Sequence, residues 1–390
     1  MTAGTKTAEK EKPGILVFID WYRPAYKAGG PVRSLANMVD QLKGDFDFYI
    51  LTRNRDLGST EGFPEIEADR WLEREGIRVC YCSKAGLRRR ALKEKAENAG
   101  CAIWYVNGIY SWYFSILPLL LAASIKPKKV LIAARGMLQS HALAVKGCKK
   151  QAFLQLARRV GLYRRAIFHA TSNEEAEAIT RLLGAKTRVK MAPNLLAVRK
   201  KRPPERQKNR GELKLLFLGR ISPEKGTLEA IRYLPLSGHG KLSLHIVGKD
   251  SNAGYAEECR LAAAEAGPGR EVIFHGALPP AKVEELMDEM HFLLLPTTGE
   301  NFGHAIPESL QSGLPVIISD RTPWKGVEDA GAGRVVALGD EKGFERALKE
   351  ALNMDRKSYA ERSRSAQNYL PGLQDMREAF LLNKTLFTDD

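Results

Sequence analysis

Short apolar runs alternate with amphipathic stretches along almost the whole chain, and the alternation occurs twice. The first series begins with Ile15–Trp21, and the pattern restarts at Leu213–Leu218. Apolar runs of this length predict buried strands, and the amphipathic stretches between them predict helices. Strands that alternate with helices form βαβ units around a parallel sheet. The sequence therefore predicts an α/β protein with two doubly wound, Rossmann-like domains facing each other across a cleft.

The boundary between the two domains is expected at a stretch rich in Lys, Arg and Pro, Leu195–Gly211. We interpret this stretch as a solvated hinge between the domains. The two domains are then expected at residues 1–196 and 197–368. The other candidate strands are Phe46–Leu51, Ile77–Cys82, Ala102–Val106, Val130–Ala134, Ile167–Ala170, Leu242–Val247, Val272–Phe274, Phe292–Leu295, Val316–Ile318 and Val335–Val336. The candidate helices include Val32–Leu42, Ala142–Arg158, Lys342–Leu352 and Glu361–Leu382.

The positive charge of the chain is concentrated in its first half. The net charge is +15 over 390 residues, but residues 1–200 carry 35 basic and 18 acidic side chains, against 26 and 28 in residues 201–390. Between Asn98 and Asn173 there are 11 basic residues and no acidic one. Such a field attracts polyanions, either nucleic acid or an anionic membrane face, although a solvated, solubilising surface is the simpler alternative.

Cysteine use and the apolar stretches favour the cytoplasm. The five cysteines show no paired CxxC spacing, so neither a disulfide framework nor a zinc site is indicated. The polar N-terminus, residues 1–13, has no apolar core typical of a secretory signal. The most apolar stretch, Trp112–Ile125, is shorter than a membrane span and predicts a buried helix.

The segment Pro296–Asp320 contains the clearest candidate ligand-binding residues of the chain. A strand ends before a loop with Gly299 and Gly303, and a helix is expected to start near Pro307. Backbone N–H groups of such a loop suit a phosphate or a sugar hydroxyl. Glu300 lies in the loop and Glu308 in the first helical turn, where a carboxylate can accept two ribose hydroxyls, although a residue at this position often serves only the helix dipole.

Two further loops follow predicted strands. In Phe217–Thr227, Arg220 and Lys225 lie five positions apart after a strand, which fits a clamp for a diphosphate. In Tyr26–Pro31, Gly29 and Gly30 separate the first strand from a helix and allow the backbone to approach a phosphate. By themselves the two cations could be solvated loop charges, and a Gly-Gly pair marks many ordinary turns.

Together these motifs resemble the retaining glycosyltransferase family 4, the glycosyl transferases group 1, whose fold is GT-B. The resemblance rests on Arg220 with Lys225, on Glu300 and Glu308 flanking Phe302-Gly303, and on the N-terminal Gly-Gly loop, and it is most specific over residues 213–320. Two further segments, residues 170–174 and 192–194, look like the family's approach to the second domain. PAYKAGGP and residues 135–138 are similar to members that build bacterial surface polysaccharides, including lipopolysaccharide.

The resemblance implies a role for each candidate residue. Arg220 and Lys225 would bind the donor diphosphate and stabilise it as it leaves. Glu300 would hold the donor sugar, Glu308 the ribose, and Gly29-Gly30 would close on the diphosphate from the opposite domain. The amides that would assist Glu300 belong to Phe302, Gly303 and His304. A last helix, residues after about 368, would return to the first, acceptor-binding domain.

The implied enzyme is a retaining hexosyltransferase that needs no metal. It would move a sugar from a nucleoside-diphosphate donor, with UDP favoured over GDP by family frequency, to a saccharide or lipid-linked saccharide. Many members place a histidine after the strand that corresponds to Val130–Ala134; here Arg135 stands at that place and His141 follows six positions later. Arg135 or His141 could supply the missing function, and the sequence leaves this open.

Other interpretations of the sequence find less support. Asp45-Phe46-Asp47 matches a metal-binding DxD pattern but precedes a strand, so a turn is expected, and the histidines lack ligand spacing. No tightly bound cofactor or metal is predicted. The alternatives are a nucleic-acid-binding protein, for which no reading module is present, and a nucleotide-sugar isomerase of the same fold. The expected location is the cytoplasm, with peripheral contact to the inner membrane.

Overall fold

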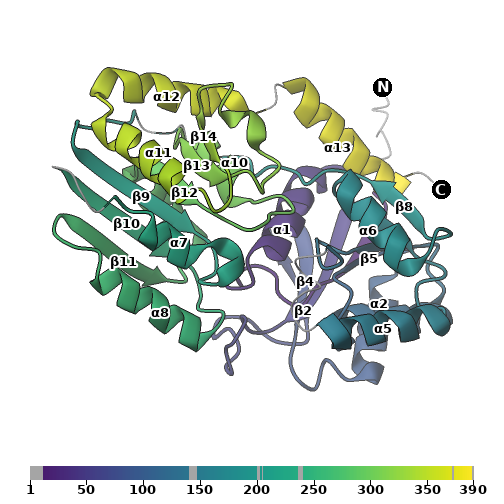
Figure 1. The fold of residues 1–390 in the computed structure, drawn as a ribbon. Coiled ribbons are helices and arrows are strands. Elements are labelled where there is room, and N and C mark those ends of the chain that lie inside the picture. Colours follow the sequence, from purple (N-terminus) through teal and green to yellow (C-terminus); the bar gives the residue numbers. More distant parts are fainter. Residues whose placement is uncertain are drawn as a thin grey trace, which may run out of the picture. The chain divides into compact units, whose positions relative to one another are not determined.

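The chain folds around two sheets whose strands are mostly parallel. The structure is a computed structural model that describes residues 12–139, 147–199, 203, 205–235, 240–370 and 373–388. The chain folds into two compact units. The first unit comprises Met1–Ala25, Leu35–Pro193 and Glu378–Asp390, and the second comprises Tyr26–Ser34 and Asn194–Arg377. Helices lie on both faces of each sheet (Figure 1), which confirms the predicted α/β class.

The first sheet has the strand order β3-β4-β2-β1-β5-β6-β7-β8, and its pairs are parallel except β3 with β4. Its strands are β1 Gly14–Phe18, β2 Asp47–Arg53, β3 Trp71–Arg74, β4 Ile77–Cys82, β5 Ile103–Asn107, β6 Lys129–Ala133, β7 Ile167–Ala170 and β8 Arg188–Met191. The associated helices are α1 Gly30–Leu42, α2 Arg89–Ala99, the π-helical turn η1 Trp112–Ile116, α3 Leu117–Ile125, α5 Gly147–Arg159, α6 Asn173–Leu183 and α13 Leu373–Thr388.

The second sheet has the order β11-β10-β9-β12-β13-β14 and is parallel throughout. Its strands are β9 Glu212–Leu218, β10 Lys241–Val247, β11 Arg270–Gly276, β12 Phe292–Leu295, β13 Val316–Ser319 and β14 Gly333–Val336. Its helices are α7 Thr227–Arg232, α8 Ala253–Ala264, α9 Pro280–Glu289, α10 Ala305–Gln311, α11 Glu341–Asn353 and α12 Arg356–Tyr369, with 3-10 turns η2 Pro223–Lys225 and η3 Lys325–Val327. The strands run through an apolar core that includes Leu215, Phe217, Leu294 and Ile317.

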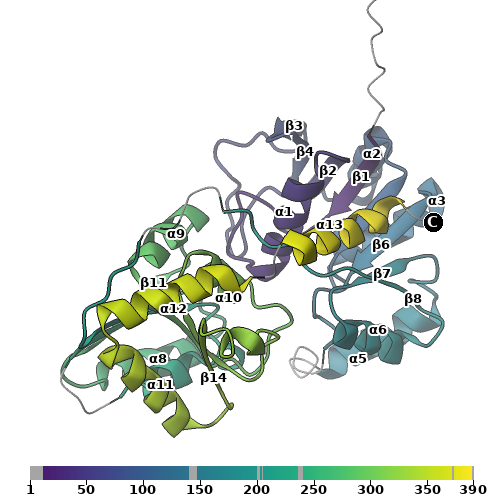
Figure 2. The ribbon, with the colours of Figure 1, turned by 90° about the horizontal axis from the view of Figure 1, so that it is seen from above.

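The C-terminal helix packs on the first sheet, as predicted (Figure 2). The Phe387 ring lies 5.4 Å from the Phe46 ring and 5.7 Å from the Tyr105 ring, measured between centroids. Asn383 Nδ2 donates a hydrogen bond to the Pro193 carbonyl at 2.8 Å. Burying these aromatic rings fixes the end of the chain to the first unit.

The predicted helix Glu361–Leu382 is wrong, because the structure has two helices there. α12 ends at Tyr369 and α13 begins at Leu373. The sequence between them contains Pro371, which removes a backbone donor and disfavours helical geometry at the preceding residue. The Pro-Gly dipeptide at this point was the signal for the break.

The interpretation of Leu195–Gly211 as a solvated hinge is wrong for two of its cations. The side chains of Arg206 and Lys208 are almost fully buried. Lys208 Nζ donates to the carbonyls of Leu352 and Met354, both at 3.0 Å, at the end of α11. These cations satisfy carbonyl groups that a helix end leaves without partners, so they anchor the segment to the second unit.

The apolar stretch Trp112–Ile125 forms η1 and α3 and is buried over much of its length, including Leu117 and Leu121. Trp112 is an exception, with 55% of its surface exposed. Within the described ranges, no helix has the length and apolarity needed to cross a lipid bilayer.

Candidate functional site

The strand order of the second sheet reverses between β9 and β12. In open α/β sheets, ligands bind beyond the carboxyl ends of the strands at such a reversal. The loop after β9 carries Arg220 and Lys225, and the loop after β12 carries Glu300. The topology therefore brings these three candidate residues to one edge of the second sheet.

Lys225 and Glu300 form an ion pair at this edge. Lys225 Nζ lies 2.5 Å from Glu300 Oε1, and the two side chains are 21% and 9% exposed. Arg220 is exposed on the same loop. The loops are also joined through Glu224, whose carbonyl accepts hydrogen bonds from the Thr297 hydroxyl and the Thr298 amide, both at 2.9 Å.

A glycine allows the two loops to approach so closely. Gly226 has φ +69°, and a Cβ atom at this position would lie 2.1 Å from the Pro296 carbonyl oxygen. Any other residue would combine a left-handed backbone with a severe clash. Gly226 therefore sets the backbone path that presents Lys225 to Glu300.

The loop after β12 is held from three sides. Ser319 Oγ donates to the Thr297 carbonyl at 2.6 Å, the Glu300 amide donates to the Arg321 carbonyl at 3.1 Å, and Trp324 Nε1 donates to the Phe302 carbonyl at 2.5 Å. Within the described residues, the N–H groups of Phe302 and Gly303 have no acceptor. The loop thus presents backbone donors in a fixed geometry, which suits an oxygen-rich ligand.

Glu308 and His304 contact the start of α1, which belongs to the second unit together with the Gly29-Gly30 loop. Arg33 Nη1 donates to Glu308 Oε1 at 2.7 Å, and Ser34 Oγ lies 2.7 Å from His304 Nε2. Gly29 has φ +70°, and a Cβ at Gly30 would lie 3.8 Å from the His304 ring. The structure thereby brings the glycine loop beside the Phe302–Glu308 segment.

Burial raises the pKa of the Glu308 carboxyl, while the neighbouring Arg33 guanidinium acts in the opposite direction. The side chain of Glu308 is 12% exposed. For an acid whose pKa is raised in the folded state, the contribution to stability is greatest below the unfolded pKa and is lost as pH rises through the folded pKa. An ionised Glu308 is therefore costly for the fold.

Arg135 lies at the carboxyl end of β6 in the first unit. Its backbone has φ +52°, which is uncommon for a residue with a side chain. Arg135 Nε donates to Asn107 Oδ1 and Nη2 donates to the Tyr105 hydroxyl, both at 2.9 Å. The Tyr105 hydroxyl in turn lies 2.7 Å from His169 Nδ1. A partly buried chain of hydrogen bonds thus holds the guanidinium in place.

His169 is the neutral end of that chain. Burial, together with the nearby Arg135 charge, lowers the pKa of His169 to about 3. Its Nε2 lies 2.8 Å from the Ala192 carbonyl. A carbonyl can only accept, so Nε2 carries the proton and Nδ1 accepts from Tyr105. His141, the other candidate here, lies outside the described residues.

Glu175 is a buried carboxylate that the sequence motifs did not indicate. One oxygen accepts the Gly136 amide at 2.6 Å, and the other accepts the Thr171 amide and hydroxyl at 2.8 and 2.7 Å. It ties the turn after β6, which carries Arg135, to the turn after β7. The sequence motif over residues 170–174 ended at Glu174, which is exposed, and so did not include the buried Glu175 that follows it.

Asp45 and Phe46 form the turn before β2, Asp47 is the first residue of that strand, and Phe46 is buried in the core. Among the residues that the structure describes, no group of three or more His, Cys, Asp and Glu side chains could hold a metal ion.

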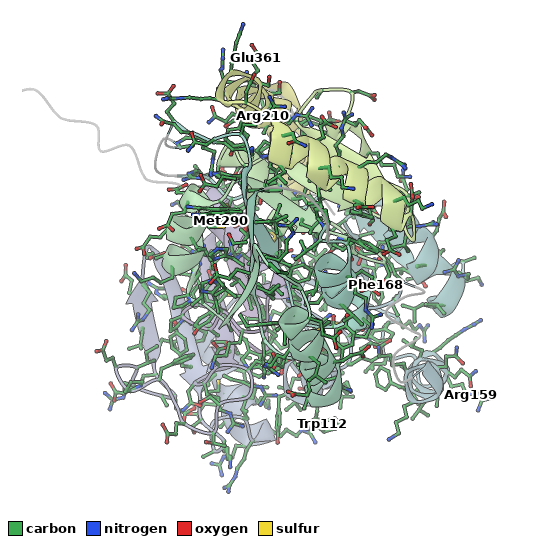
Figure 3. The ribbon with its side chains drawn as sticks, turned by 60° about the vertical axis from the view of Figure 1, so that its left-hand side comes forward. Trp112, Arg159, Phe168, Arg210, Met290 and Glu361 are labelled. Carbon is green, nitrogen blue, oxygen red and sulfur yellow. The ribbon has the colours of Figure 1, made fainter. Side chains whose placement is uncertain are left out.

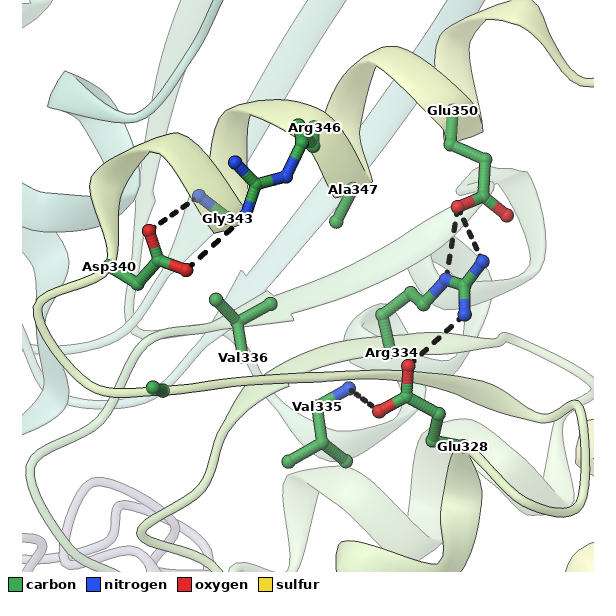
Figure 4. Close-up of a pocket in the computed structure, with 10 residues that line it drawn as sticks. Glu328, Arg334, Val335, Val336, Asp340, Gly343, Arg346, Ala347 and Glu350 are labelled. Carbon is green, nitrogen blue, oxygen red and sulfur yellow. Dashed lines mark hydrogen bonds and ion pairs between the residues drawn. The ribbon is translucent and has the colours of Figure 1, made fainter.

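A separate pocket of about 360 Å³ lies between β14 and α11 (Figure 4). Its charged lining is paired internally: Arg334 contacts Glu328 and Glu350 at 3.1 and 2.7 Å, and Arg346 contacts Asp340 at 3.5 Å. None of the candidate site residues lines it. Its side chains satisfy one another, so it does not extend the candidate site.

Comparison with known proteins gives a family-model match over part of the chain and a shared fold over most of it. Residues 198–369 match the family model described as glycosyl transferases group 1. The D-inositol 3-phosphate glycosyltransferase of Nocardia farcinica is 30% identical over 165 residues, which cover 39% of this chain and 37% of that protein. The chain thus matches less than two fifths of the length of this curated relative.

Two solved structures share the fold over nearly the whole chain. Sucrose-phosphate synthase from Thermosynechococcus elongatus superposes with a TM-score of 0.66 at 16% identity, covering 97% of this chain and 100% of that one. HepE from Anabaena, in complex with UDP and glucose, has a TM-score of 0.64 at 15% identity, covering 96% and 98%. The chain has the GT-B fold, and its residues 198–369 match the glycosyl transferases group 1 model.

Proposed function

We propose that this protein is a retaining glycosyltransferase that uses a nucleoside-diphosphate sugar, with UDP favoured over GDP. The observation that carries the proposal is the meeting of Lys225 and Glu300 at the reversal point of the second sheet, with Arg220 on the same loop. Residues 197–368 would bind the donor, and residues 1–196 with about 369–390 would bind the acceptor. The HepE structure, crystallised with UDP and glucose, supports a uridine donor by likeness of fold.

Each residue of the site has a role in this proposal. Arg220 and Lys225 bind the diphosphate, Glu308 accepts the ribose hydroxyls, and Glu300 accepts hydroxyls of the donor sugar. The amides of Phe302, Gly303 and His304 donate to oxygens of the donor, and Gly29-Gly30 lets the backbone approach the diphosphate. The unpartnered N–H groups of Phe302 and Gly303, which lie in the described part of the chain, support this assignment.

The reaction breaks the bond between the anomeric carbon and the phosphate oxygen and forms a bond to the acceptor oxygen. Negative charge develops on the leaving diphosphate, and the two cations are already placed to stabilise it. The departing phosphate oxygen takes the proton of the acceptor hydroxyl on the same face of the sugar, which retains the configuration. Arg135 adds positive charge on the acceptor side.

The donor assignment is tested by thermal unfolding with UDP or GDP, with and without EDTA. A ligand present at 100 times its dissociation constant adds about 2.7 kcal/mol of stability. We expect one nucleotide to raise the melting temperature, EDTA to leave that rise unchanged, and the Arg220→Ala/Lys225→Ala variant to lose it. Absence of a response to both nucleotides contradicts a UDP or GDP donor, and loss of the response in EDTA contradicts metal independence.

We further propose a lipid-linked or membrane-proximal saccharide acceptor in cell-surface polysaccharide synthesis, reached from an anionic membrane face. The end of helix α5 supports this: Leu156 on α5 and Val160, the residue after the helix, lie one turn apart and are 60% and 66% exposed. Arg158 and Arg159 are exposed beside them, and Figure 3 shows Arg159 at the surface. Apolar side chains flanked by cations suit the interface of an anionic bilayer.

Sedimentation with liposomes tests this contact. We expect vesicles containing anionic lipid to retain the protein at low salt and release it at high salt, because about 1 kcal/mol per basic residue comes from the surface potential. Leu156→Gln/Val160→Gln should weaken retention. Leu261→Gln on α8 is the matched control, since Leu261 is also 60% exposed. Equal retention by neutral vesicles, or equal loss in the control, contradicts the proposed surface.

A further inference from the structure

Two consecutive side chains in the first turn of α1 hold the predicted ribose and sugar segment. Arg33 Nη1 donates to Glu308 Oε1 at 2.7 Å, and Ser34 Oγ lies 2.7 Å from His304 Nε2. The Arg33 side chain is 33% exposed and that of Glu308 is 12% exposed, so the ion pair is largely shielded from water. A charge-assisted hydrogen bond in such a place fixes a side chain more firmly than one at the surface.

The pair leaves one side of the carboxylate open. Glu308 Oε1 is bonded to Arg33, and within the described residues Oε2 has no partner. A carboxylate offers about four acceptor positions. Arg33 can therefore stay in place while Glu308 accepts the hydroxyls of a ribose.

We propose that Arg33 is a positioning residue for nucleotide binding, which orients Glu308 and keeps its carboxylate ionised for the ribose hydroxyls. This rests on the proposed function, which assigns the ribose to Glu308. Arg33 acts through Glu308 rather than by contact with the nucleotide. Ser34 supports it by holding His304, whose amide is assigned to the donor.

The charges around Glu308 give the direction of the pH effect. Burial raises its pKa, Arg33 on α1 lowers it, and Glu284 on α9 raises it; His304 stands one turn before it on the same segment. Only the ionised carboxylate accepts both ribose hydroxyls, so nucleotide binding weakens as pH falls through this pKa. Removing Arg33 leaves burial and Glu284 unopposed, and binding should then be lost at a higher pH.

The experiment is calorimetric titration of the protein with UDP, or with GDP where the wild type prefers it, between pH 5 and 8.5. We expect Arg33→Gln to weaken binding about tenfold near pH 7 and to move the acid-side loss upward by about one pH unit. Arg33→Lys, which keeps the charge, should restore most of the wild-type pH profile. Glu308→Gln should bind weakly and should keep only the pH dependence that comes from the terminal phosphate of the nucleotide.

The double variant Arg33→Gln/Glu308→Gln decides how Arg33 acts. If Arg33 works through Glu308, the double variant binds as weakly as Glu308→Gln alone. Additive losses, or an unchanged pH profile in Arg33→Gln, overturn the proposal. A wild type that binds neither nucleotide contradicts the proposed function instead. Melting temperatures of the variants without nucleotide show that each is folded before its binding is compared.

Discussion

Replacing Lys225 with alanine is expected to lower kcat for sugar transfer about 10²- to 10³-fold, the range seen when one preorganised group that stabilises developing charge is removed. Lys225 lies in the loop after β9, and its ammonium is held 2.5 Å from Glu300 Oε1. The diphosphate carries more negative charge in the transition state than in the bound donor. Loss of the cation should therefore reduce kcat more than it raises KM.

The measurement is the release of nucleoside diphosphate from the donor that the wild type accepts. Lys225→Arg keeps a positive charge and should therefore be faster than Lys225→Ala. It should remain slower than the wild type, because the planar guanidinium donates its hydrogen bonds in a different geometry from an ammonium. Lys214→Ala is the matched control, because Lys214 lies near the other end of the same strand and is 42% exposed. A Lys225→Ala enzyme with wild-type kcat contradicts the diphosphate role. If Lys214→Ala loses as much kcat as Lys225→Ala, the loss reflects reduced stability of the fold and not a role in binding the diphosphate.

The residues at strand ends could be predicted because strand ends are visible in the sequence. The run Leu213–Leu218 stops before Gly219, and Phe292–Leu295 stops before Pro296. Parallel packing then brings both carboxyl ends to one edge. Arg220, Lys225 and Glu300 could therefore be placed at that edge from the order of the apolar runs alone, before any side-chain contact was known.

Contacts that depend on side-chain direction could not be predicted. Arg33 and Glu308 are 275 residues apart, and nothing in either local pattern indicates the other. Glu174 and Glu175 are neighbours in the sequence, but successive residues of a helix point about 100° apart, so only one of them is buried. The sequence motif located the turn after β7. The packing of α6 determines which of the two carboxylates is buried and bonded to that turn.

Short edge strands were missed for a related reason. β3 Trp71–Arg74 and β8 Arg188–Met191 have four residues each and lie at the two edges of the first sheet. Edge strands are half exposed, so they carry charged residues and lack the apolar run that marks a central strand. Their existence follows from backbone pairing with β4 and β7 and not from a hydrophobic pattern.

Replacing Arg206 with methionine is expected to destabilise the second unit by about 3–5 kcal/mol, because each buried carbonyl that loses its donor costs about 1–3 kcal/mol. The guanidinium donates to the carbonyls of Met287, Met290 and Ser312 at 2.9, 2.7 and 2.9 Å. These carbonyls lie at the ends of α9 and α10. Methionine fills much of the volume but donates nothing, so several buried acceptors lose their partner.

Denaturant unfolding followed by circular dichroism measures this loss, with the two units fitted as separate transitions. Arg346→Met is the control, because Arg346 is 72% exposed and has one ion pair at 3.5 Å, worth less than about 1 kcal/mol. A change of that small size in Arg206→Met would mean that water replaces the guanidinium at the three carbonyls. The large loss would instead show that a cation in a stretch resembling a hinge holds two helix ends together.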